Sequence, residues 1–326
     1  MERRGSVRPT GSTLEVPRLV CGTMTFGAQT PRHDAAAMVD RCRDDGITMF
    51  DTANAYNDGR SEELLGELLS PFRDEVTIAT KAFNPMGPDP DDRGLSPAAI
   101  RKALDASMRR LRTDHIDLYY LHQPDWDVPL EETLGTMVGL VEGGRIGAIG
   151  VSNHAAWQIA ELRRISDANG WPQVSISQQQ YNLVSRRVEE EYAAYTAHAG
   201  LVDIVYSPLA GGLLTGKHAP DRDPEAGSRF TKEQYRQRYW NRATFEAVEQ
   251  LRHIAAEAGL SLPELSFRWL WSQPLVDAIL LGASKLDHFE NNLAAASVRR
   301  RLDDETLRRC DEVWEPLRGP APAYNR

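Results

Sequence analysis

The stretch Gly46-Ile47-Thr48-Met49-Phe50-Asp51-Thr52-Ala53-Asn54-Ala55-Tyr56 decides the fold. Its first part is a short apolar run with a β-branched lead and an aromatic end, which predicts a buried strand, and the run stops at a carboxylate. We therefore expect the strand to carry Asp51 at its C-terminal end. Tyr56 follows five residues later in a polar loop, close enough for its hydroxyl to face the same cavity. Taken alone, the pair also fits a turn-forming Asp followed by a surface Tyr.

The same pattern of a strand followed by a helix recurs along the chain. Apolar runs predict strands at residues 16–22, 47–50, 76–80, 116–121, 146–151, 174–177, 202–205 and 278–281. Helices are predicted at residues 31–45, 61–69, 96–111, 129–142, 155–168, 187–198, 243–258 and 262–271. We expect Ser61 and Ser96 to open two of these helices as capping residues, and residues 210–241 to be irregular.

Eight such units predict the fold class. Alternating strands and helices are typical of a parallel sheet, and eight units in about 270 residues are what a closed (β/α)8 barrel uses. We therefore expect residues 1–326 to form a single α/β domain, a (β/α)8 TIM barrel with long loops at its C-terminal face and extra helices. A doubly wound open sheet is the alternative, but no G-x-G-x-x-G motif opens the first helix.

The composition narrows the classes of function. Apolar residues make up 41% of the chain and charged residues 26%, as in ordinary soluble proteins. The net charge of -9 argues against a nucleic-acid partner, because no excess of basic side chains can displace counterions from phosphates. The basic run Arg299-Arg300-Arg301 is offset by Asp303-Asp304-Glu305, and we interpret the whole run as a solvated helix face.

Cysteine usage and the N-terminus bear on the compartment. Cys21, Cys42 and Cys310 are far apart, odd in number and without metal-ligand spacing, which suits a reducing cytoplasm. Residues 1–9 carry arginines but no apolar segment of a secretory signal, and no apolar run approaches the ~20 residues of a membrane span. We expect a soluble, cytoplasmic protein without a membrane partner.

The predicted strand ends carry polar side chains of complementary chemistry. In a barrel of this kind the residues at the carboxyl ends of the strands point into one shared mouth. In chain order these residues are Asp51, Lys81, His122, Ser152 with Asn153, Gln178, Tyr206 and Gly282. If ordinary turn preferences alone chose these residues, an acid, an ammonium and an imidazole would seldom occur at consecutive strand ends. Together with Tyr56, they predict a proton-transfer group.

The chemistry of this group follows from ordinary acidities. A phenol is a weak acid at neutral pH, and an ammonium group beside it stabilises the phenolate. Lys81 can supply that charge, and Asp51 can hold Lys81 in place and keep it protonated. His122 can donate a hydrogen bond to a substrate oxygen and orient it. The arrangement suits protonation of an oxygen whose carbon has just received a hydride.

Short motifs in a fixed order carry a family resemblance. They are Phe50-Asp51-Thr52-Ala53-Asn54-Ala55-Tyr56, Ala79-Thr80-Lys81, Tyr120-Leu121-His122, Gly150-Val151-Ser152-Asn153, Gln178-Gln179-Gln180-Tyr181-Asn182 and Tyr206-Ser207-Pro208-Leu209. With them the chain resembles the aldo-keto reductase superfamily over nearly its whole length. The resemblance implies an NADPH-dependent carbonyl reductase on a TIM barrel, with NADP+ as the oxidised cofactor. Asp51, Tyr56, Lys81 and His122 match the family's catalytic tetrad.

A closer likeness is to the aflatoxin-aldehyde and succinic-semialdehyde reductase subgroup. The motifs behind it are Tyr56-Asn57-Asp58-Gly59, the run from Pro208 to Lys217, Tyr235-Arg236-Gln237-Arg238-Tyr239-Trp240 and the terminal Pro322-Ala323-Tyr324-Asn325-Arg326. This likeness implies a homodimer that reduces aldehydes or reactive dicarbonyl compounds.

The resemblance also implies a cofactor site. Ser152, Asn153 and Gln178 would hydrogen-bond the nicotinamide carboxamide, and the ring of Tyr206 would stack on the nicotinamide. The pyrophosphate would lie along residues 207–217 under Arg229, and the adenosine 2′-phosphate would meet Ser284 and Lys285 at a helix N-terminus. The remaining residues placed at the cofactor are Gly22, Thr23, Met24, Ser207, Pro208, Leu209, Gly211, Leu213, Gly216, Lys217, Gly282, His288, Asn291 and Asn292.

Two features of this cofactor site depart from simple patterns. Residues 211–217 imitate a P-loop, but His218 rather than Ser or Thr follows Lys217 and no helix start is evident, which argues against nucleoside-triphosphate binding. Subgroup relatives usually carry Gln at the position of His288 and an acid or Gln at that of Asn291. We expect NADPH to be preferred over NADH, because Lys285 is retained.

Two arginines are candidates for binding a substrate carboxylate. Arg238 and Arg326 could each pair with a carboxylate in two-pronged fashion, which would favour aldehydes that bear an acid, such as succinic semialdehyde. Surface arginines that contact only solvent are the alternative. His122 and Trp126 are also assigned to the substrate, and Trp126, Trp240 and Met24 could line an apolar wall or simply belong to the core.

Two other classes of function compete with the reductase. The chain could be a nucleotide-binding accessory subunit, since relatives of this barrel also serve as β-subunits of potassium channels, and an intact tetrad does not exclude that role. A metal-dependent barrel hydrolase would need several His and Asp residues at strand ends, and only His122 and Asp51 qualify. We expect no metal.

Overall fold

The computed structural model describes residues 5–10, 12–224 and 227–320, which fall into two compact units. The first comprises the described residues up to Gln179 together with Tyr195–Ile204 and Asp277–Phe289. The second comprises Gln180–Ala194, Val205–Val276 and the described residues from Glu290 onward. The expectation of one domain over residues 1–326 stays a prediction.

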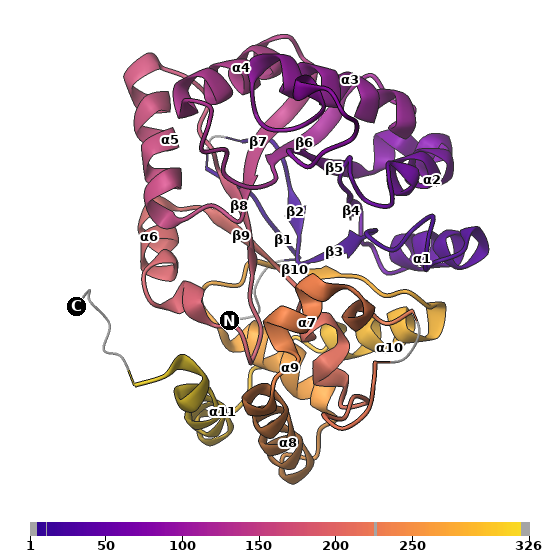
Figure 1. The fold of residues 1–326 in the computed structure, drawn as a ribbon, viewed down its shortest axis with the longest axis vertical. Coiled ribbons are helices and arrows are strands. Elements are labelled where there is room, and N and C mark those ends of the chain that lie inside the picture. The colour runs from indigo at the N-terminus through magenta and orange to yellow at the C-terminus, as the bar shows by residue number, and fades with distance from the viewer. Residues whose placement is uncertain (1–4, 11, 225–226, 321–326) are drawn as a thin grey trace. The chain divides into compact units, whose positions relative to one another are not determined.

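Eight parallel strands close into a barrel, so the predicted (β/α)8 fold is confirmed (Figure 1). Around the barrel the strand order is β10, β3, β4, β5, β6, β7, β8 and β9. The strands are β3 (Leu19–Gly22), β4 (Met49–Asp51), β5 (Thr77–Ala82), β6 (Ile116–Leu121), β7 (Ile146–Ser152), β8 (Ile176–Gln180), β9 (Val202–Tyr206) and β10 (Ala278–Leu281).

The predicted first strand is divided in two. Val16–Pro17 form β2, which pairs antiparallel with β1 (Ser6–Val7) in a separate two-stranded sheet that the sequence did not predict. The barrel strand β3 begins only at Leu19. Pro17 has no N–H to donate to a barrel ladder, and a proline is tolerated at the edge of a small sheet.

The helices of the first unit lie close to their predicted positions. They are α1 (Arg32–Asp44), α2 (Arg60–Leu69), α3 (Pro97–Leu111), α4 (Leu130–Glu142) and α5 (Ala156–Asn169). Ser96 caps α3 as expected, because its side chain accepts from Ala99 N at 3.1 Å. Ser61 does not cap α2: the helix starts at Arg60 after the left-handed Gly59, and the Ser61 side chain is buried.

Side chains from all eight strands or their flanks fill the barrel. The interior cluster includes Val20, Met49, Leu118, Ile176 and Ile204, all essentially without solvent exposure. Tyr120 belongs to the same cluster, and its ring needs Gly150 on the next strand. A Cβ at Gly150 would lie 2.5 Å from Cδ1 of Tyr120, so only glycine leaves room for this phenol.

Helices predominate in the second unit. It contains α7 (Glu233–Tyr239), α8 (Arg242–Glu257), α9 (Leu262–Ser272) and α11 (Asp304–Arg318), and α8 packs against α11. The stretch 210–241 is therefore less irregular than expected, since it also contains the short 3-10 helices η4 (Ala210–Thr215) and η5 (Arg229–Thr231). The helix α10 (Leu286–Ser297) follows β10, and α6 (Tyr192–Ala199) follows η3 (Arg187–Glu189), where one continuous helix was expected.

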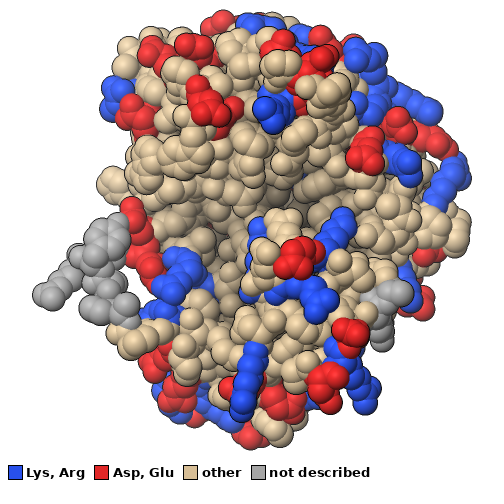
Figure 2. Space-filling view, viewed as in Figure 1, with Lys and Arg blue, Asp and Glu red and all other residues tan. Residues whose placement is uncertain are grey.

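The charged run at residues 299–305 is not one helix face. Arg299, Arg300 and Arg301 lie in a loop, and Asp303 caps α11 by accepting from Thr306 N at 2.8 Å. A side-chain acceptor at this position ends the loop and starts the helix. Figure 2 shows basic and acidic side chains interspersed on the face that it presents. No helix within the described ranges is long and apolar enough to cross a membrane.

Candidate active site

Asp51 and Lys81 meet inside the barrel mouth. Asp51 ends β4, where it is in register with Gly22 of β3 and Ala79 of β5. Lys81 lies within β5, which continues through Ala82, rather than directly after the strand as predicted. The Lys81 ammonium donates to the Asp51 carboxylate and, at 2.7 Å, to the carbonyl of Thr52. Neither side chain is exposed by more than 1%.

Burial and pairing act in opposite directions on these two charges. Burial lowers the pKa of Lys81, and attraction to Asp51 opposes that shift. Burial likewise raises the pKa of Asp51, while Lys81 and a hydrogen bond from Gln178 oppose it. The Gln178 amide donates to Asp51 Oδ2 at 2.8 Å. The pair is thus an ion pair without water, in which each charge depends on the other.

Tyr56 lies in the loop after β4, and that loop is fixed to its neighbours. The Asn57 side-chain amide donates to the carbonyls of Met24 and Phe26 at 2.9 and 2.8 Å. The Lys81 Nζ lies 5.2 Å from the centroid of the Tyr56 ring. The structure therefore brings the predicted phenol and ammonium together.

His122 follows β6 and completes the group. Its ring meets the Tyr56 ring edge-on, with centroids 6.0 Å apart and an interplanar angle of 80°. Burial and the nearby Lys81 charge lower the pKa of His122 to about 3, so the imidazole is neutral at physiological pH. The Asn84 amide nitrogen lies 3.2 Å from His122 Nδ1. Because that amide can only donate, Nδ1 accepts and Nε2 carries the proton.

Asn84 and a buried layer behind Lys81 were not predicted. Thr80 donates to Glu62 Oε1 at 2.5 Å, and Arg110 Nε donates to Glu62 Oε2 at 2.7 Å. The Glu62 side chain is fully buried, and its charge raises the pKa of Lys81 as a lesser contribution. The sequence carried one signal for this layer: Glu62 precedes Leu65 by three residues and Leu69 by seven, which places it on the apolar face of α2, where a solvated acid is not expected.

Hydroxyl groups support the backbone under Asp51. Ser61 donates to the carbonyl of Thr23 at 2.8 Å and lies 2.9 Å from the Thr52 hydroxyl. The Thr23 hydroxyl in turn donates to the carbonyl of Asp51 at 3.0 Å. Ser61 therefore joins α2 to the ends of β3 and β4, which is why it is buried instead of capping the helix.

The residues predicted to hold the nicotinamide carboxamide are brought together. Ser152 Oγ donates to the carbonyl of Gln178 at 3.0 Å, and the Asn153 amide donates to Ser152 Oγ at 3.1 Å and to the carbonyl of His122 at 2.9 Å. A ligand carboxamide needs both donors and acceptors, and one hydroxyl with two side-chain amides supplies both. Their assignment to a nicotinamide carboxamide stays a prediction.

Other predicted cofactor residues of the first unit lie in two loops. Gly22, Thr23 and Met24 end β3 and begin the next loop; a Cβ at Gly22 would lie 3.1 Å from Leu280 Cγ, so this glycine lets β3 approach β10. Gly282 and Ser284 follow β10. The carbonyl of Lys285 accepts from Phe289 N at 3.1 Å, which places Lys285 at the start of α10 as predicted. His288 lies on that helix, and Asn291 and Asn292 lie on the part of it that belongs to the second unit.

The predicted pyrophosphate loop belongs to the second unit. Tyr206 ends β9, and Ser207 follows with a positive φ of 57°, held by the Asn182 amide that donates to its carbonyl at 2.9 Å. Gly211, Gly212 and Gly216 also have positive φ values of 70°, 107° and 76°. Pro208 and Leu209 lie in this turn, Leu213 is buried in η4, and Arg229 opens η5 with its guanidinium 5.7 Å from the Tyr235 ring.

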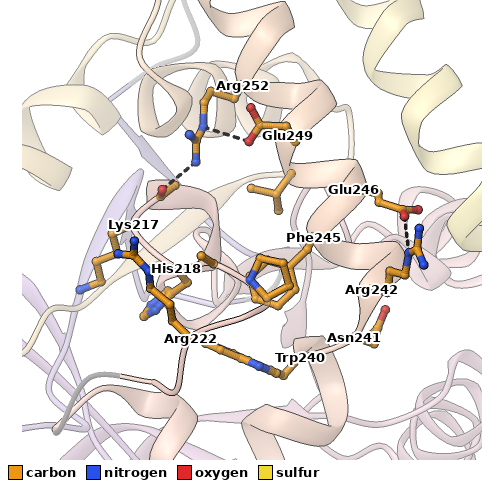
Figure 3. A pocket seen from close by; sticks show the side chains of 14 residues that line it. Lys217, His218, Arg222, Trp240, Asn241, Arg242, Phe245, Glu246, Glu249 and Arg252 are labelled. Atoms are coloured by element: carbon orange, nitrogen blue, oxygen red, sulfur yellow. Dashed lines mark hydrogen bonds and ion pairs between the residues drawn. The ribbon is translucent and has the colours of Figure 1, made fainter.

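Lys217 lines a cavity of 740 Å3 within the second unit (Figure 3). Trp240 and Phe245 form an aromatic wall, with ring centroids 5.0 Å apart. Arg252 donates to the carbonyl of Gly216 at 2.7 Å and so fixes the end of the glycine-rich turn. No helix follows Lys217 among the described residues up to 224, which agrees with the argument against a P-loop.

The predicted substrate residues other than His122 come from both units. Trp126 is exposed after β6, and Arg238 is exposed on α7. Arg326 and the terminal motif 322–326 lie outside the described residues. Within residues 5–10, 12–224 and 227–320, no three His, Cys, Asp or Glu side chains gather as they would around a metal ion.

The model of the Aldo/keto reductase family matches residues 18–315. The chain belongs to the aldo/keto reductase family. Aldo/keto reductases are oxidoreductases that use nicotinamide cofactors to reduce carbonyl groups, and this chain is therefore an oxidoreductase of that kind. Asp51, Tyr56, Lys81 and His122 lie at the C-terminal ends of the strands, the face at which TIM-barrel enzymes have their active sites, and their catalytic roles stay predictions.

Individual aldo/keto reductases are similar to this chain over most of its length. Aflatoxin B1 aldehyde reductase member 2 from Homo sapiens is 36% identical over 325 residues, which cover 94% of this chain and 89% of that protein. Aldo-keto reductase family 7 member A3 from Homo sapiens is 34% identical over 95% of this chain and 97% of that protein. A probable voltage-gated potassium channel subunit beta from Oryza sativa subsp. japonica is 36% identical over 93% and 94% respectively.

Proposed function

We propose that this aldo/keto reductase uses NADPH to reduce aldehydes and other reactive carbonyl compounds to alcohols, with Tyr56 as the proton donor. One observation carries the proposal: a fully buried lysine, held by Asp51 and the carbonyl of Thr52, has its ammonium 5.2 Å from the Tyr56 ring. The positive charge of Lys81 stabilises the phenolate that remains after proton donation. NADPH, when bound, supplies the hydride.

His122 has a different task in this proposal. It is neutral, its Nδ1 accepts from Asn84, and its Nε2–H is left to donate a hydrogen bond to the substrate oxygen. A neutral imidazole polarises the carbonyl without competing with Tyr56 as the acid. The edge-on contact keeps the two rings close together, with centroids 6.0 Å apart, as a shared substrate oxygen would require.

The preference for NADPH rests on the start of α10. Ser284 and Lys285 stand at a helix N-terminus, where backbone N–H groups and the lysine charge favour a phosphate dianion. We expect Lys285→Ala to raise the KM for NADPH while leaving the KM for NADH unchanged. A wild-type preference for NADH would contradict the role of Lys285.

Carboxylated aldehydes such as succinic semialdehyde are proposed as one substrate class. Support comes from the exposed guanidinium of Arg238 and from the human relative named aflatoxin B1 aldehyde reductase, which shows that aldehydes are substrates of that protein. Removal of Arg238 or Arg326 should raise the KM for a carboxylated aldehyde and not for a neutral one. Equal KM values before and after removal would rule the arginines out.

The decisive experiment replaces Tyr56 with phenylalanine. We expect Tyr56→Phe to abolish NADPH oxidation with every aldehyde tested, because the proton donor is lost. NADPH binding, followed by quenching of tryptophan fluorescence, should survive. Tyr195→Phe, which removes a phenol on α6, is the matched control and should leave turnover unchanged. Full turnover by Tyr56→Phe would overturn the proposal.

A second experiment separates the alternative function. The rice relative named as a channel subunit beta keeps open an accessory subunit that binds NADPH with little turnover. Steady-state NADPH oxidation by the wild-type chain with succinic semialdehyde, 2-nitrobenzaldehyde, methylglyoxal and phenanthrenequinone distinguishes the two. Tight NADPH binding without turnover on all four compounds would favour the accessory role.

A further inference from the structure

An open cavity lies among three neighbouring helices of the first unit. The helices α1, α2 and α3 lie next to one another on the outside of the barrel (Figure 1). The cavity between them has a volume of 880 Å3, within the range of about 300–1,000 Å3 that is usual for small-ligand sites. Eight of the fourteen residues that line it are charged, which favours a polar ligand. None of the fourteen is among the predicted catalytic, cofactor or substrate residues.

Positive charge predominates in this cavity, although acids predominate in the chain. The whole chain has 38 basic and 47 acidic residues, whereas five arginines and three acids line the cavity. With the buried Glu62 counted as a fourth acid beside Arg110, five positive charges still stand against four negative ones. The arginines are Arg32, Arg60, Arg109, Arg110 and Arg112, and we call the space that they line the arginine cavity.

Three of the five arginines have no acidic partner. Within the part of the chain that the structure describes, Arg60, Arg109 and Arg112 make no ion pair, and all three are exposed. The other two arginines are paired, one with Glu67 and one with Glu62. Three guanidinium groups at one cavity are therefore available to an anion that enters from solvent.

The position of Arg60 is unfavourable without an anion. Arg32 and Arg60 are the first residues of α1 and α2, where the positive end of the helix dipole disfavours a cation. Glu67 offsets the charge of Arg32, but Arg60 has no such partner among the described residues. Basic residues in the last turn of α3, such as Arg109, are explained by the dipole of their own helix. Arg60 is not explained in this way, and an anion in the cavity would offset its charge.

Two glycines let the cavity wall pack directly on arginine side chains. A Cβ at Gly27 would lie 2.8 Å from Cβ of Arg60, and a Cβ at Gly59 would lie 2.8 Å from Cδ of Arg110. Both glycines also have positive φ values, 75° and 88°, which other residues rarely adopt. Arg110 is held further by its bond to Glu62 at 2.7 Å. Part of the site is therefore formed before a ligand binds, which lowers the entropic cost of binding.

Two acids on the same cavity set a minimum charge for the ligand. Asp58 and Glu63 are exposed and make no ion pair among the described residues, so they repel an anion that enters. A carboxylate carries a single negative charge, whereas a phosphate group carries about −1.5 to −2 at pH 7 and offers three acceptor oxygens. Guanidinium groups bind such oxygens in two-pronged fashion. A ligand with more than one phosphate group therefore suits three arginines better than a carboxylate does.

We propose that the arginine cavity binds a small anion that carries a diphosphate group, through Arg60, Arg109 and Arg112. The site is a second ligand site, formed by residues of the first unit alone. The proposal does not depend on the proposed reductase function, because no residue of the cavity takes part in hydride or proton transfer.

The test titrates inorganic pyrophosphate into the chain saturated with NADP+ and measures the heat of binding. One pyrophosphate per chain is expected, with a Kd that rises with salt concentration because salt screens exposed charges. Arg60→Gln, Arg109→Gln and Arg112→Gln should each raise the Kd about three- to tenfold, and the triple variant should bind none. Glu63→Gln should instead lower the Kd, because it removes a repelling charge. All four side chains are exposed, so the variants should fold as the wild type does.

Two controls locate the bound anion. Arg101→Gln removes an exposed arginine of α3 that does not line the cavity, and it should leave the Kd unchanged. Lys285→Gln, with NADP+ still saturating, should also leave the Kd unchanged. A Kd that responds to Lys285 and not to the three arginines would place the anion at the predicted cofactor residues and overturn the site. Absence of pyrophosphate binding would overturn it too, and sulfate bound as tightly as pyrophosphate would overturn the assignment to a diphosphate.

Discussion

Lys81 is a lysine that water does not reach, and its surroundings explain why it can stay charged. Its ammonium has two acceptors, the Asp51 carboxylate and the carbonyl of Thr52, and a second buried acid, Glu62, adds a weaker attraction. Removing one partner of such a pair leaves an uncompensated buried charge, which typically costs about 3–5 kcal/mol. Lys81 and Asp51 are therefore stable in this buried position only when both are present.

The pKa of His122 gives a prediction for the pH dependence of turnover. Because burial and Lys81 lower this pKa to about 3, the imidazole stays neutral as the pH falls from 8 to about 5. We expect kcat to show no acidic limb near pH 6.5 that depends on His122. His122→Gln should lower kcat about 100-fold, as loss of one donor to a developing oxyanion does, without changing the shape of the profile over this range.

The measurement is kcat against pH for the wild type and His122→Gln, with NADPH and aldehyde saturating. His154 serves as the control, since burial also lowers its pKa, to about 4, and its ring nitrogen Nδ1 is bonded to the carbonyl of Ser152 at 2.8 Å. A wild-type limb near pH 6.5 that disappears in His122→Gln would show a charged imidazole and contradict the assigned role.

The sequence predicted the residues of the tetrad-like group and the contact of Asp51 with Lys81, but not the other residues that hold the group. Asp51, Lys81 and His122 could be placed because strand ends in a parallel barrel converge, whichever side-chain conformations follow. The bond from Asn84 to His122 and the buried Glu62 depend on side-chain directions, and periodicity does not determine those. The roles of all these residues stay predictions.

At the level of elements, α2 and α3 show how close packing depends on one residue. A Cβ at Gly66 of α2 would lie 2.5 Å from the carbonyl of Arg110 and 2.6 Å from the backbone of Leu111, at the end of α3. Backbone atoms cannot move aside as a flexible side chain can. Any larger residue at Gly66 must push the two helices apart, and Glu62 and Arg110 are bonded across the same contact.

Two alanine substitutions test this packing. Gly66→Ala should lower the free energy of unfolding by about 2 kcal/mol or more, as overpacking does. Gly139→Ala is the matched control, because Gly139 also lies inside a helix, α4, but a Cβ there meets nothing within 4 Å. The control should be stabilised by up to about 1 kcal/mol through helix propensity. Denaturant unfolding measures both, and equal effects would contradict the close approach.

Element boundaries show where pattern reasoning loses accuracy. β6 and β10 were predicted to the residue, since β10 is a continuous apolar run, β6 is apolar apart from Asp117, and a polar residue or glycine follows each. The strand predicted at residues 174–177 is β8, which begins at Ile176 and extends to Gln180. Polar glutamines suggest the end of a strand in the sequence, but their backbone can still pair in the sheet. The helix α7 was missed because its seven residues are too short for a helical period to be recognised.

Across the whole barrel, closure depends on the contact between its last and first strands. Asp277, just before β10, accepts from Asp203 N at 3.1 Å and pairs with Arg18, whose guanidinium also donates to the Asp277 carbonyl at 2.6 Å. The backbone adds Ile279 N to the carbonyl of Arg18 at 2.9 Å. These bonds join β9, β10 and β3 at the opposite strand ends from Asp51.

We expect Asp277→Ala to lower the free energy of unfolding by about 2 kcal/mol, because Arg18 is 7% exposed and would lose a charged partner. Turnover at temperatures below the transition should not change, since the site is at the other end of the strands. Asp40→Ala, which removes an exposed carboxylate from α1, should leave stability within about 0.5 kcal/mol. Unaltered stability of Asp277→Ala would show that this contact does not secure closure.

The sequence alone was sufficient to predict the (β/α)8 barrel. Each strand–helix unit can be recognised from a short local pattern, and the number and order of these units indicate the fold. It was not sufficient for the small β1–β2 sheet, since a two-residue pairing such as Ser6 with Pro17 leaves no periodic signal.

The hydrogen bond from Gln178 to Asp51 has a consequence for redesign. β8 and β4 are not neighbours in the barrel. This single side-chain bond therefore links two strands that share no backbone hydrogen bonds. A substitution of Gln178 made to change the cofactor would also remove a hydrogen-bond donor that lowers the pKa of Asp51 and so favours its ionised form. A redesign of the predicted cofactor contact at residue 178 would therefore also change the pKa of Asp51.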